Sequence, residues 1–424
     1  MNFEEHLKAY LNKKEIDDLL NSLARPSLNA ALLNLRKMDD KTFVSLFPNV
    51  IPHPYVKHAY IYDKEEYPLG KSIYHELGCF YLQEPSAMMP AYLLHAQDND
   101  FVLDMCAAPG GKSIQSSFLM DNKGLIIAND ISYKRAESIR DNVERLGIGN
   151  LAIINKDLCE FLPIFKESFD KIILDAPCSG SGMFRKNDLM KDDWSYNKVL
   201  KFQETQKQLI LNAYQYLKPG GIICYSTCSF SKEEDEDVVS YLLANSDAIL
   251  LDIDDNPLFY KSPSKIGIHL FPHLFPGEGH YIALIKKPGE IKKKNNETKH
   301  DKWIKQIDNV NDYHYSFHYD DVCFLASEYF SLKNLPLIRY GAKVGELINN
   351  EFRFNYHYAH FLSSYEKEYE LNDEELNKYL KGETIDVSLT KGEVLIKYKT
   401  ISVDFARSDG RILKNRYPKY LRRR

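Results

Sequence analysis

The segment Phe101–Ser113, which reads FVLDMCAAPGGKS, constrains the fold more than any other part of the chain. A short apolar run leads into a turn of small residues and then into a helix-like segment, SIQSSFLM. Doubly wound α/β proteins form ligand sites in this way, because small residues let a ligand approach the backbone and the helix N-terminus offers N–H groups. Cys106 stands where a P-loop needs its first glycine, and the glycines do not follow G-x-G-x-x-G. The alternative to a ligand site is a strand–helix turn that has only a structural role.

Strands and helices alternate at short spacing from residue 100 onward, which predicts a parallel sheet with crossover helices, a doubly wound Rossmann-like α/β fold. The predicted strands are FVLDM, GLIIAND, LAIINKD, KIILDAP and GIICYSTCS. The first four end in or beside an aspartate: Asp104, Asp130, Asp157 and Asp175.

A single aspartate at such a position is commonly a helix cap, whereas four at successive strand ends favour a ligand crevice. An acid after the second strand usually accepts ribose hydroxyls, which suits Asp130, and Asp157 suits an adenine amine. An acid-lined nucleoside crevice without a phosphate loop fits S-adenosylmethionine, which has a cationic sulfonium and no phosphate.

Two cysteine motifs follow at strand ends: DAPCSG at 175–180 and STCS at 226–229. Methylating C5 of a pyrimidine is difficult because that carbon is not nucleophilic, and a thiolate that adds to C6 overcomes this. Enzymes that methylate exocyclic nitrogens need no thiol and carry Asp/Asn-Pro-Pro-aromatic at the fourth strand. DNA cytosine methyltransferases use one Pro-Cys there, so a second cysteine at the next strand end disfavours them.

Composition is that of an ordinary globular protein: 424 residues, 44% hydrophobic and 27% charged, with a net charge of −5. Seven cysteines without C-x-x-C pairs predict a reducing compartment and no zinc site. The N-terminal segment lacks a signal-peptide pattern and no run reaches membrane-spanning length, so we expect a cytoplasmic protein without a membrane partner. The last fourteen residues hold seven Lys or Arg and no acid.

CAAPGGK, AND, DAPCSG and STCS, in this order and spacing, resemble the Sun (NSUN) family of RNA 5-methylcytosine methyltransferases. QEPSAMMPAYLL and LFPHLFPGEGHYIALIKK resemble the segments that open and close that family's catalytic domain. The C-terminal third is similar to a bacterial branch that acts on small-subunit rRNA. The resemblance covers roughly residues 70–424, and the first 60 residues are expected to depart from the family.

The resemblance implies residue roles that spacing alone does not assign. Cys228 would attack C6, Cys178 would assist release of the methylated RNA, and Asp175 would bind the polar edge of the cytosine. The cofactor S-adenosylmethionine would be held by Asp130, Asp157, Asp175 and the turn Cys106, Ala107, Ala108, Pro109, Gly110, Gly111 and Lys112. No metal is implied.

Five regions are predicted: an N-terminal RNA-binding or accessory region at 1–80, a methyltransferase domain at 81–287, a linker at 288–302, a small mixed domain at 303–362 and an RNA-binding domain at 363–424. The last resembles the pseudouridine-synthase-and-archaeosine-transglycosylase (PUA) module. Its basic residues would contact phosphates, giving affinity without sequence choice; they are Lys414, Arg416, Lys419 and Arg422, with Arg423 and Arg424 beyond them.

The motifs predict a methyltransferase for cytosine C5, and the resemblance implies that its substrate is 16S rRNA near the decoding region. The target base must be exposed or flipped to reach the thiols. We expect the partner to be RNA within the small-subunit particle rather than DNA, and the protein to be a monomer. The alternatives are a tRNA cytosine methyltransferase and a non-catalytic ribosome-assembly factor, although the latter should have lost Cys228, Asp175 or the GGK turn.

Overall fold

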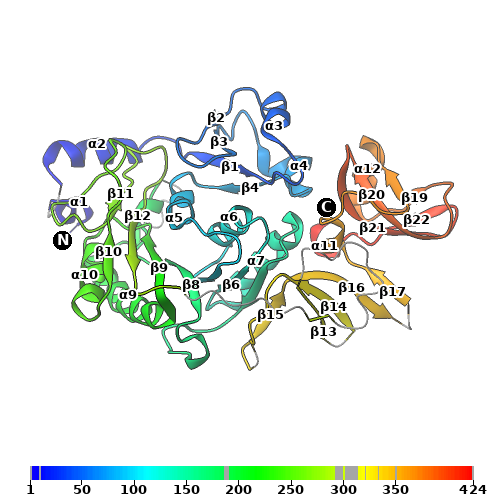
Figure 1. Ribbon diagram of the computed structural model, residues 1–424. Coiled ribbons are helices and arrows are strands. Elements are labelled where there is room, and N and C mark those ends of the chain that lie inside the picture. The colour runs from blue at the N-terminus through cyan, green and yellow to red at the C-terminus, as the bar shows by residue number, and fades with distance from the viewer. Residues whose placement is uncertain are drawn as a thin grey trace.

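The computed structural model describes residues 2–8, 11–185, 191–291, 299–300, 314–319, 321–332, 334–348 and 351–422. Within them the strands form one large central sheet and three smaller sheets (Figure 1). One of the smaller sheets is formed by the N-terminal residues and the other two by residues in the C-terminal third. No helix in this part of the chain combines the length and apolar character needed to cross a membrane. The predicted linker at 288–302 lies largely outside the described residues.

The central sheet has nine strands in the order β10-β12-β9-β8-β5-β6-β7-β15, with β11 paired to β12. Strands β5 to β9 are all parallel, and β10, β12 and β15 add antiparallel pairs at the two edges. This confirms the predicted doubly wound fold, with the order switching between β5 and β8. The bounds are β5 (Phe101–Asp104), β6 (Leu125–Asn129), β7 (Leu151–Ile154), β8 (Phe169–Asp175), β9 (Leu217–Thr227), β10 (Ile249–Leu251), β11 (Ile268–His269), β12 (Tyr281–Lys286) and β15 (Leu337–Tyr340).

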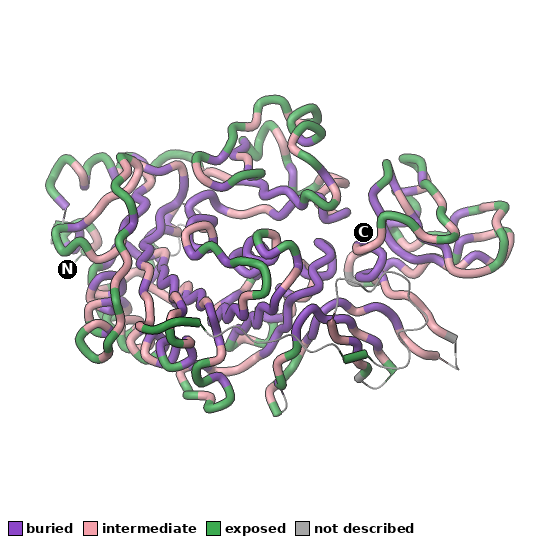
Figure 2. Tube along the Cα trace, viewed as in Figure 1, coloured by how far each residue is buried: buried purple, intermediate pink, exposed green. Residues whose placement is uncertain are grey.

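Helices cover both faces of this sheet because successive strand residues point to opposite sides. Val102 belongs to a cluster with α5 (Met89–Leu94), α6 (Gly111–Leu119) and α7 (Tyr133–Leu146), whereas Leu103 belongs to a cluster with α9 (Tyr196–Tyr216) and α10 (Glu236–Ala244). Figure 2 shows the resulting band of buried backbone through the middle of the molecule. Helix α7 has the expected signals, a Ser132 cap and Gly147 in the left-handed region at φ 69°.

Strand β15 was not anticipated. It comes from the region predicted as a small mixed domain, yet it pairs antiparallel with β7 and so completes the edge of the central sheet. The rest of that region forms a four-stranded sheet from β13 (Tyr315–Tyr319), β14 (Val322–Ala326), β16 (Ala342–Ile348) and β17 (Glu351–Phe354).

The N-terminal residues form a second four-stranded sheet in the order β2-β3-β1-β4. The apolar residues of its two leading helices, such as Leu7 and Leu19, pack instead against Phe230 and Phe271 of the central unit. The bounds are α1 (Phe3–Leu7), α2 (Lys13–Leu23), β1 (Asn29–Leu33), α3 (Asp40–Leu46), β2 (Ile51–Pro52), β3 (Ala59–Tyr62), η1 (Leu69–Lys71), α4 (Ile73–Glu76), β4 (Phe80–Gln83) and η2 (Ser86–Met88).

The C-terminal residues form a five-stranded sheet in the order β18-β20-β21-β22-β19. Its apolar side shares one buried cluster with the N-terminal sheet, in which Phe80 and Tyr417 both take part, so the two ends of the chain pack together. The bounds are α11 (Tyr356–Ala359), β18 (Glu368–Glu370), α12 (Asp373–Lys381), β19 (Ile385–Asp386), β20 (Gly392–Tyr398), β21 (Ile401–Ser408), β22 (Ile412–Lys414) and η6 (Lys419–Leu421).

Candidate active site

Asp175, the last residue of β8, is the centre of a hydrogen-bonded cluster at the carboxyl ends of the parallel strands. Lys112, from the first turn of α6, donates to its Oδ2 at 2.7 Å, and Ser226, paired with it on β9, donates to Oδ1 at 2.7 Å. Burial alone raises the pKa of Asp175, but Lys112 and His280 outweigh it, so the pKa lies below the usual carboxyl range. Asp175 is therefore a fixed carboxylate.

The side chains of the two predicted catalytic cysteines are in contact. The sulfurs of Cys178 and Cys228 lie 3.2 Å apart, although 50 residues separate them in the chain. They are adjacent because β8 and β9 are neighbouring parallel strands and each cysteine follows the end of its strand. The hydrogen bond between the sulfurs, together with burial, raises the pKa of Cys178 well above the ordinary thiol value. Cys178 thus keeps its proton at neutral pH.

Glu234 ties the two cysteine loops together. Its fully buried carboxylate accepts from Ser179 N at 2.8 Å, Ser179 Oγ at 2.5 Å and Ser229 Oγ at 2.6 Å. Gln206 of α9 adds a contact at 3.2 Å. Because Ser179 follows Cys178 and Ser229 follows Cys228, this one carboxylate sets the separation of the two thiols.

The turn before α6 has the geometry of a ligand cradle. Gly110 has φ 107°, a conformation that favours glycine, and a Cβ at Gly111 would lie 2.9 Å from the Gln83 side chain. Below the turn, Ser113 donates to Asp104 at 2.6 Å while the other Asp104 oxygen, Oδ1, has no partner. An orphaned buried acceptor and a backbone without room for a side chain fit a polar ligand held close to the main chain.

Asp130 and Asp157 lie at the expected strand ends but already have partners. Asp130 is buried, accepts from Ser132 N at 2.9 Å and pairs with Arg135 at 3.1 Å. Asp157 accepts from Cys159 N at 2.9 Å. Lys112, predicted to take part in cofactor binding, has its ammonium on Asp175.

Three members of the site were not identified from the sequence: Glu234, His280 and Ser226. Glu234 stands in the run SKEEDED, whose composition is typical of an exposed acidic segment, and only its spacing from STCS signals otherwise. Among the other cysteines, Cys79, Cys224 and Cys323 are buried as expected of packing residues, and Cys159 is partly buried.

The four predicted RNA-binding residues lie at the C-terminal sheet with different surroundings. Lys414 and Lys419 are exposed, and Lys414 lies 3.8 Å from Asp409. Arg416, however, is held by both oxygens of Glu393, at 2.7 and 3.0 Å, and Arg422 Nε donates to the Tyr417 carbonyl. Arg423 and Arg424 lie outside the described residues.

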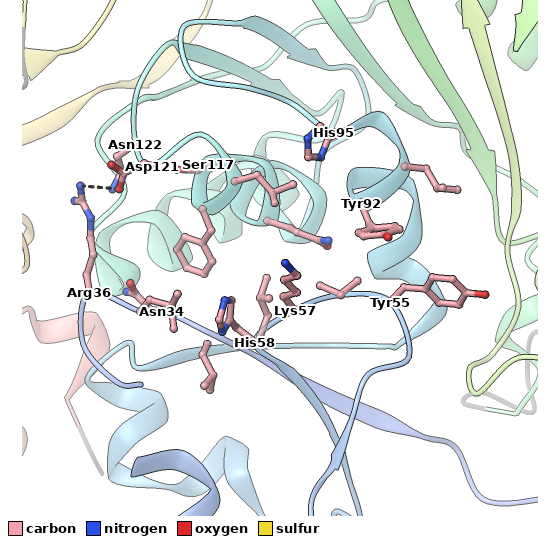
Figure 3. A pocket seen from close by; sticks show the side chains of 18 residues that line it. Asn34, Arg36, Tyr55, Lys57, His58, Tyr92, His95, Ser117, Asp121 and Asn122 are labelled. Atoms are coloured by element: carbon pink, nitrogen blue, oxygen red, sulfur yellow. Dashed lines mark hydrogen bonds and ion pairs between the residues drawn. The ribbon is translucent and has the colours of Figure 1, made fainter. Parts of the chain in front are cut away.

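A cavity of about 790 Å³ lies between the N-terminal sheet and helices α5 and α6 (Figure 3). Its walls combine aromatic and aliphatic side chains with polar rim residues such as Arg36 and Asp121, which form an ion pair at 3.9 Å. It includes none of the strand-end residues of the thiol site, so it is a separate feature of the molecule.

Family models match three parts of the chain. Residues 91–286 match "16S rRNA methyltransferase RsmB/F", residues 1–85 match the "N-terminal domain of 16S rRNA methyltransferase RsmF", and residues 366–423 match the "Methyltransferase RsmF PUA domain". The chain is 31% identical, over 96% of its length and 93% of the relative, to ribosomal RNA small subunit methyltransferase F of Shewanella piezotolerans. The Vibrio parahaemolyticus protein of that name is 30% identical over 98% of this chain and 95% of its own.

Solved structures agree on the fold. A methyltransferase homologue from Pyrococcus horikoshii has a TM-score of 0.59 and 29% identity, covering 67% of this chain and 93% of its own. NSun6 from Pyrococcus horikoshii has a TM-score of 0.60 at 22% identity, covering 68% of this chain and 98% of its own.

A Rossmann-like sheet with an acid-lined strand edge, flanked by an N-terminal domain and a PUA domain, defines an S-adenosylmethionine-dependent RNA methyltransferase. More particularly, the chain belongs to the ribosomal RNA small subunit methyltransferase F family. The match to residues 1–85 corrects one expectation, because the N-terminal 60 residues do not depart from this family.

Proposed function

We propose that the protein methylates C5 of a cytosine in small-subunit rRNA through a covalent bond between Cys228 and C6. The observation that carries this proposal is the 3.2 Å separation of the Cys178 and Cys228 sulfurs beside the Asp175–Lys112 pair. A methyltransferase acting on a nitrogen or oxygen has no use for two adjacent thiols, whereas attack on C6 requires one and its release is helped by the other.

In this mechanism the Cys228 thiolate adds to C6, which makes C5 enamine-like, and C5 then attacks an electrophilic methyl group. Bound S-adenosylmethionine would supply that methyl group and would leave as S-adenosylhomocysteine. A water molecule then accepts the C5 proton, the C5–C6 double bond re-forms and the C6–S bond breaks. Cys178 assists the last step by donating its S–H to the departing Cys228 sulfur, a role that suits a thiol whose pKa is raised.

Lys112 supports both reacting groups. It is buried with only 10% of its side chain exposed, and it interacts electrostatically with Asp175, Asp104 and Cys228. A cation at this position keeps the pKa of Asp175 low and so keeps its carboxyl group ionised. Asp175 accepts a hydrogen bond from the cytosine's amino edge, while the turn at 106–112 with Asp130 and Asp157 holds the cofactor.

The most direct test traps the adduct. Cys178→Ala protein is mixed with S-adenosylmethionine and unmodified small subunits, and a denaturing gel is run. We expect a protein–RNA band that survives denaturation and disappears when Cys228→Ala is added. A band that persists without Cys228 reverses the roles of the two thiols. A band with tRNA but none with subunits leaves the chemistry standing and changes the substrate.

For RNA binding we propose a wider surface than the basic tail. Two cavities of about 680 and 700 Å³ share Arg353 and Arg416 and lie between the β13-β14-β16-β17 sheet and the C-terminal sheet. Lys391 lines the first of them and also a neighbouring hollow that contains Arg411. Within the described part of the chain, Arg353 Nε has no partner, and neither Arg353, Lys391 nor Arg411 pairs with a carboxylate. Arginine and lysine side chains without carboxylate partners are suited to phosphates.

The surface is tested by replacing these three residues with alanine and measuring affinity for small-subunit RNA as salt is varied. Losing three phosphate contacts should reduce the slope of log K against log salt by about 2. A matched triple variant removes exposed lysines elsewhere on the protein: Lys166→Ala, Lys201→Ala and Lys265→Ala. Equal slopes for the two variants would show that the net charge of the protein, and not this surface, governs RNA binding.

A further inference from the structure

His280 lies beside the thiol site although its role is not accounted for by the mechanism above. It immediately precedes β12, whose first residue, Tyr281, pairs with Thr227 of β9. One further step of this antiparallel register places His280 opposite Cys228. Only 7% of its side chain is exposed, so an imidazole ring is buried next to the reacting groups.

The ring lies between two carboxylates. Its Nε2 is 3.7 Å from Asp175 Oδ1, and its Nδ1 is 3.9 Å from Glu84 Oε2 and 3.3 Å from Ser86 Oγ. Glu84 is itself anchored, because its carboxylate accepts from the backbone N–H groups of Ser86, Ala87 and Glu278 at 2.6 to 2.8 Å. The far end of this chain of contacts is therefore rigid.

The hydrogen-bond partners determine where the ring carries its protons. The single Ser86 hydroxyl proton is directed at Glu84, at 2.7 and 2.9 Å, and Ser86 Oγ accepts from Gly279 N at 3.1 Å. Nδ1 must then be the donor toward Ser86. The other ring nitrogen, Nε2, then faces the Asp175 carboxylate across 3.7 Å, which is a polar contact rather than a hydrogen bond.

We propose that His280 is a positioning residue for the methyl-transfer reaction: its buried ring lies against Oδ1 of Asp175, opposite Lys112 on Oδ2, and limits the rotation of that carboxylate. This inference rests on the proposed function, since it assigns Asp175 to the cytosine. Lys112 alone can hold one carboxylate oxygen while the other rotates. With Ser226 and His280 on the second oxygen, the plane of the carboxylate is fixed before the base arrives.

The test is His280→Gln, which keeps a polar side chain but removes the imidazole ring. We expect kcat with small subunits to fall by about 10-fold to 100-fold, as for a misaligned group, with the KM values for RNA and S-adenosylmethionine unchanged. In the Cys178→Ala background, the denaturation-resistant adduct should form correspondingly more slowly. A loss that appears in KM, or as reduced cofactor binding, would overturn the inference.

His269→Gln is the matched control. His269 is also buried and lies on β11 beside β12, but its carboxylate partners are Glu236 at 3.0 Å and Asp235 at 4.0 Å rather than Asp175. Its variant should keep kcat close to that of the parent. If its kcat falls as much as that of His280→Gln, a packing defect explains both losses and the positioning role is wrong.

Ser86→Ala gives an independent measurement that retains the histidine. If Ser86 acts through His280, the kcat of the double variant Ser86→Ala/His280→Gln should be no lower than that of His280→Gln alone. If the two fold-losses in kcat multiply instead, the two residues act independently and the shared pathway is contradicted. The two hypotheses fail separately. If the parent forms no adduct, the proposed function is wrong; if it does and His280→Gln forms it equally fast, only the role of His280 is wrong.

Discussion

Replacing Glu234 tests whether one buried carboxylate sets the distance between the two thiols. In Glu234→Ala the Ser179 and Ser229 hydroxyls, which lie 3.3 Å apart, can bond to one another, and Gln206 keeps the Pro177 carbonyl at 2.8 Å. What remains without an acceptor is the Ser179 N–H, one hydroxyl proton and the second amide proton of Gln206. Three unsatisfied buried donors cost about 3–9 kcal/mol.

That loss is a large part of the roughly 5–15 kcal/mol by which domains are stable, so urea unfolding should show a lower midpoint. At urea concentrations where the variant is folded, kcat should still be strongly reduced, because the two cysteine loops are no longer held together. Glu234→Gln should be milder on both measures, since serine hydroxyls can reorient toward an amide.

Glu233→Ala is the control, because Glu233 is adjacent but faces His6 at 3.2 Å rather than the cysteine loops. It should leave kcat near that of the parent. The reasoning is refuted if Glu234→Ala matches the parent in both midpoint and kcat, or if Glu234→Gln is as severe as Glu234→Ala.

Three further outcomes are expected. Lys112→Met removes the ammonium that keeps the pKa of Asp175 low, so burial raises that pKa and the acidic limb of the pH–rate profile moves to higher pH; an unmoved limb contradicts this. Gly182→Ala places a Cβ 2.8 and 2.9 Å from two backbone carbonyls and should abolish adduct formation, whereas Gly70→Ala, whose nearest neighbour is a side chain at 3.5 Å, should not. Burial raises the pKa of Asp104 to about 7, so its contribution to stability is complete below its unfolded pKa and is lost as the pH rises through 7. Asp104→Asn should reduce that fall in unfolding free energy, by about 4 kcal/mol at most, in urea titrations at several pH values.

The parallel strands and their terminal aspartates could be predicted because both depend on local pattern. An apolar run such as Phe101–Leu103 indicates a buried strand by its composition alone. Parallel strands place their carboxyl ends at one edge of the sheet whatever the connections between them. The convergence of Cys178 and Cys228 followed from the same rule. For these features, the order of elements along the chain was sufficient.

The remaining features depend on contacts that no local pattern encodes. From the sequence, Arg416 is expected to be a free cation in a basic tail. In the structure, Glu393, 23 residues earlier, forms an ion pair with it. Glu234 reads as part of an exposed acidic run, and its burial becomes evident only when Ser179 and Ser229 converge on it. In each case the decisive partner lies on a different element.

Strand β15 makes the catalytic sheet depend on a segment far downstream. The sheet's eight other strands are complete at Lys286, but the hydrogen-bonding edge of β7 stays open until residues 337–340 have been synthesised. An open strand edge is a template for pairing with another chain. During translation the methyltransferase domain therefore leaves the ribosome with one edge unprotected. A fragment ending near residue 300 would keep every catalytic residue and still be prone to aggregate.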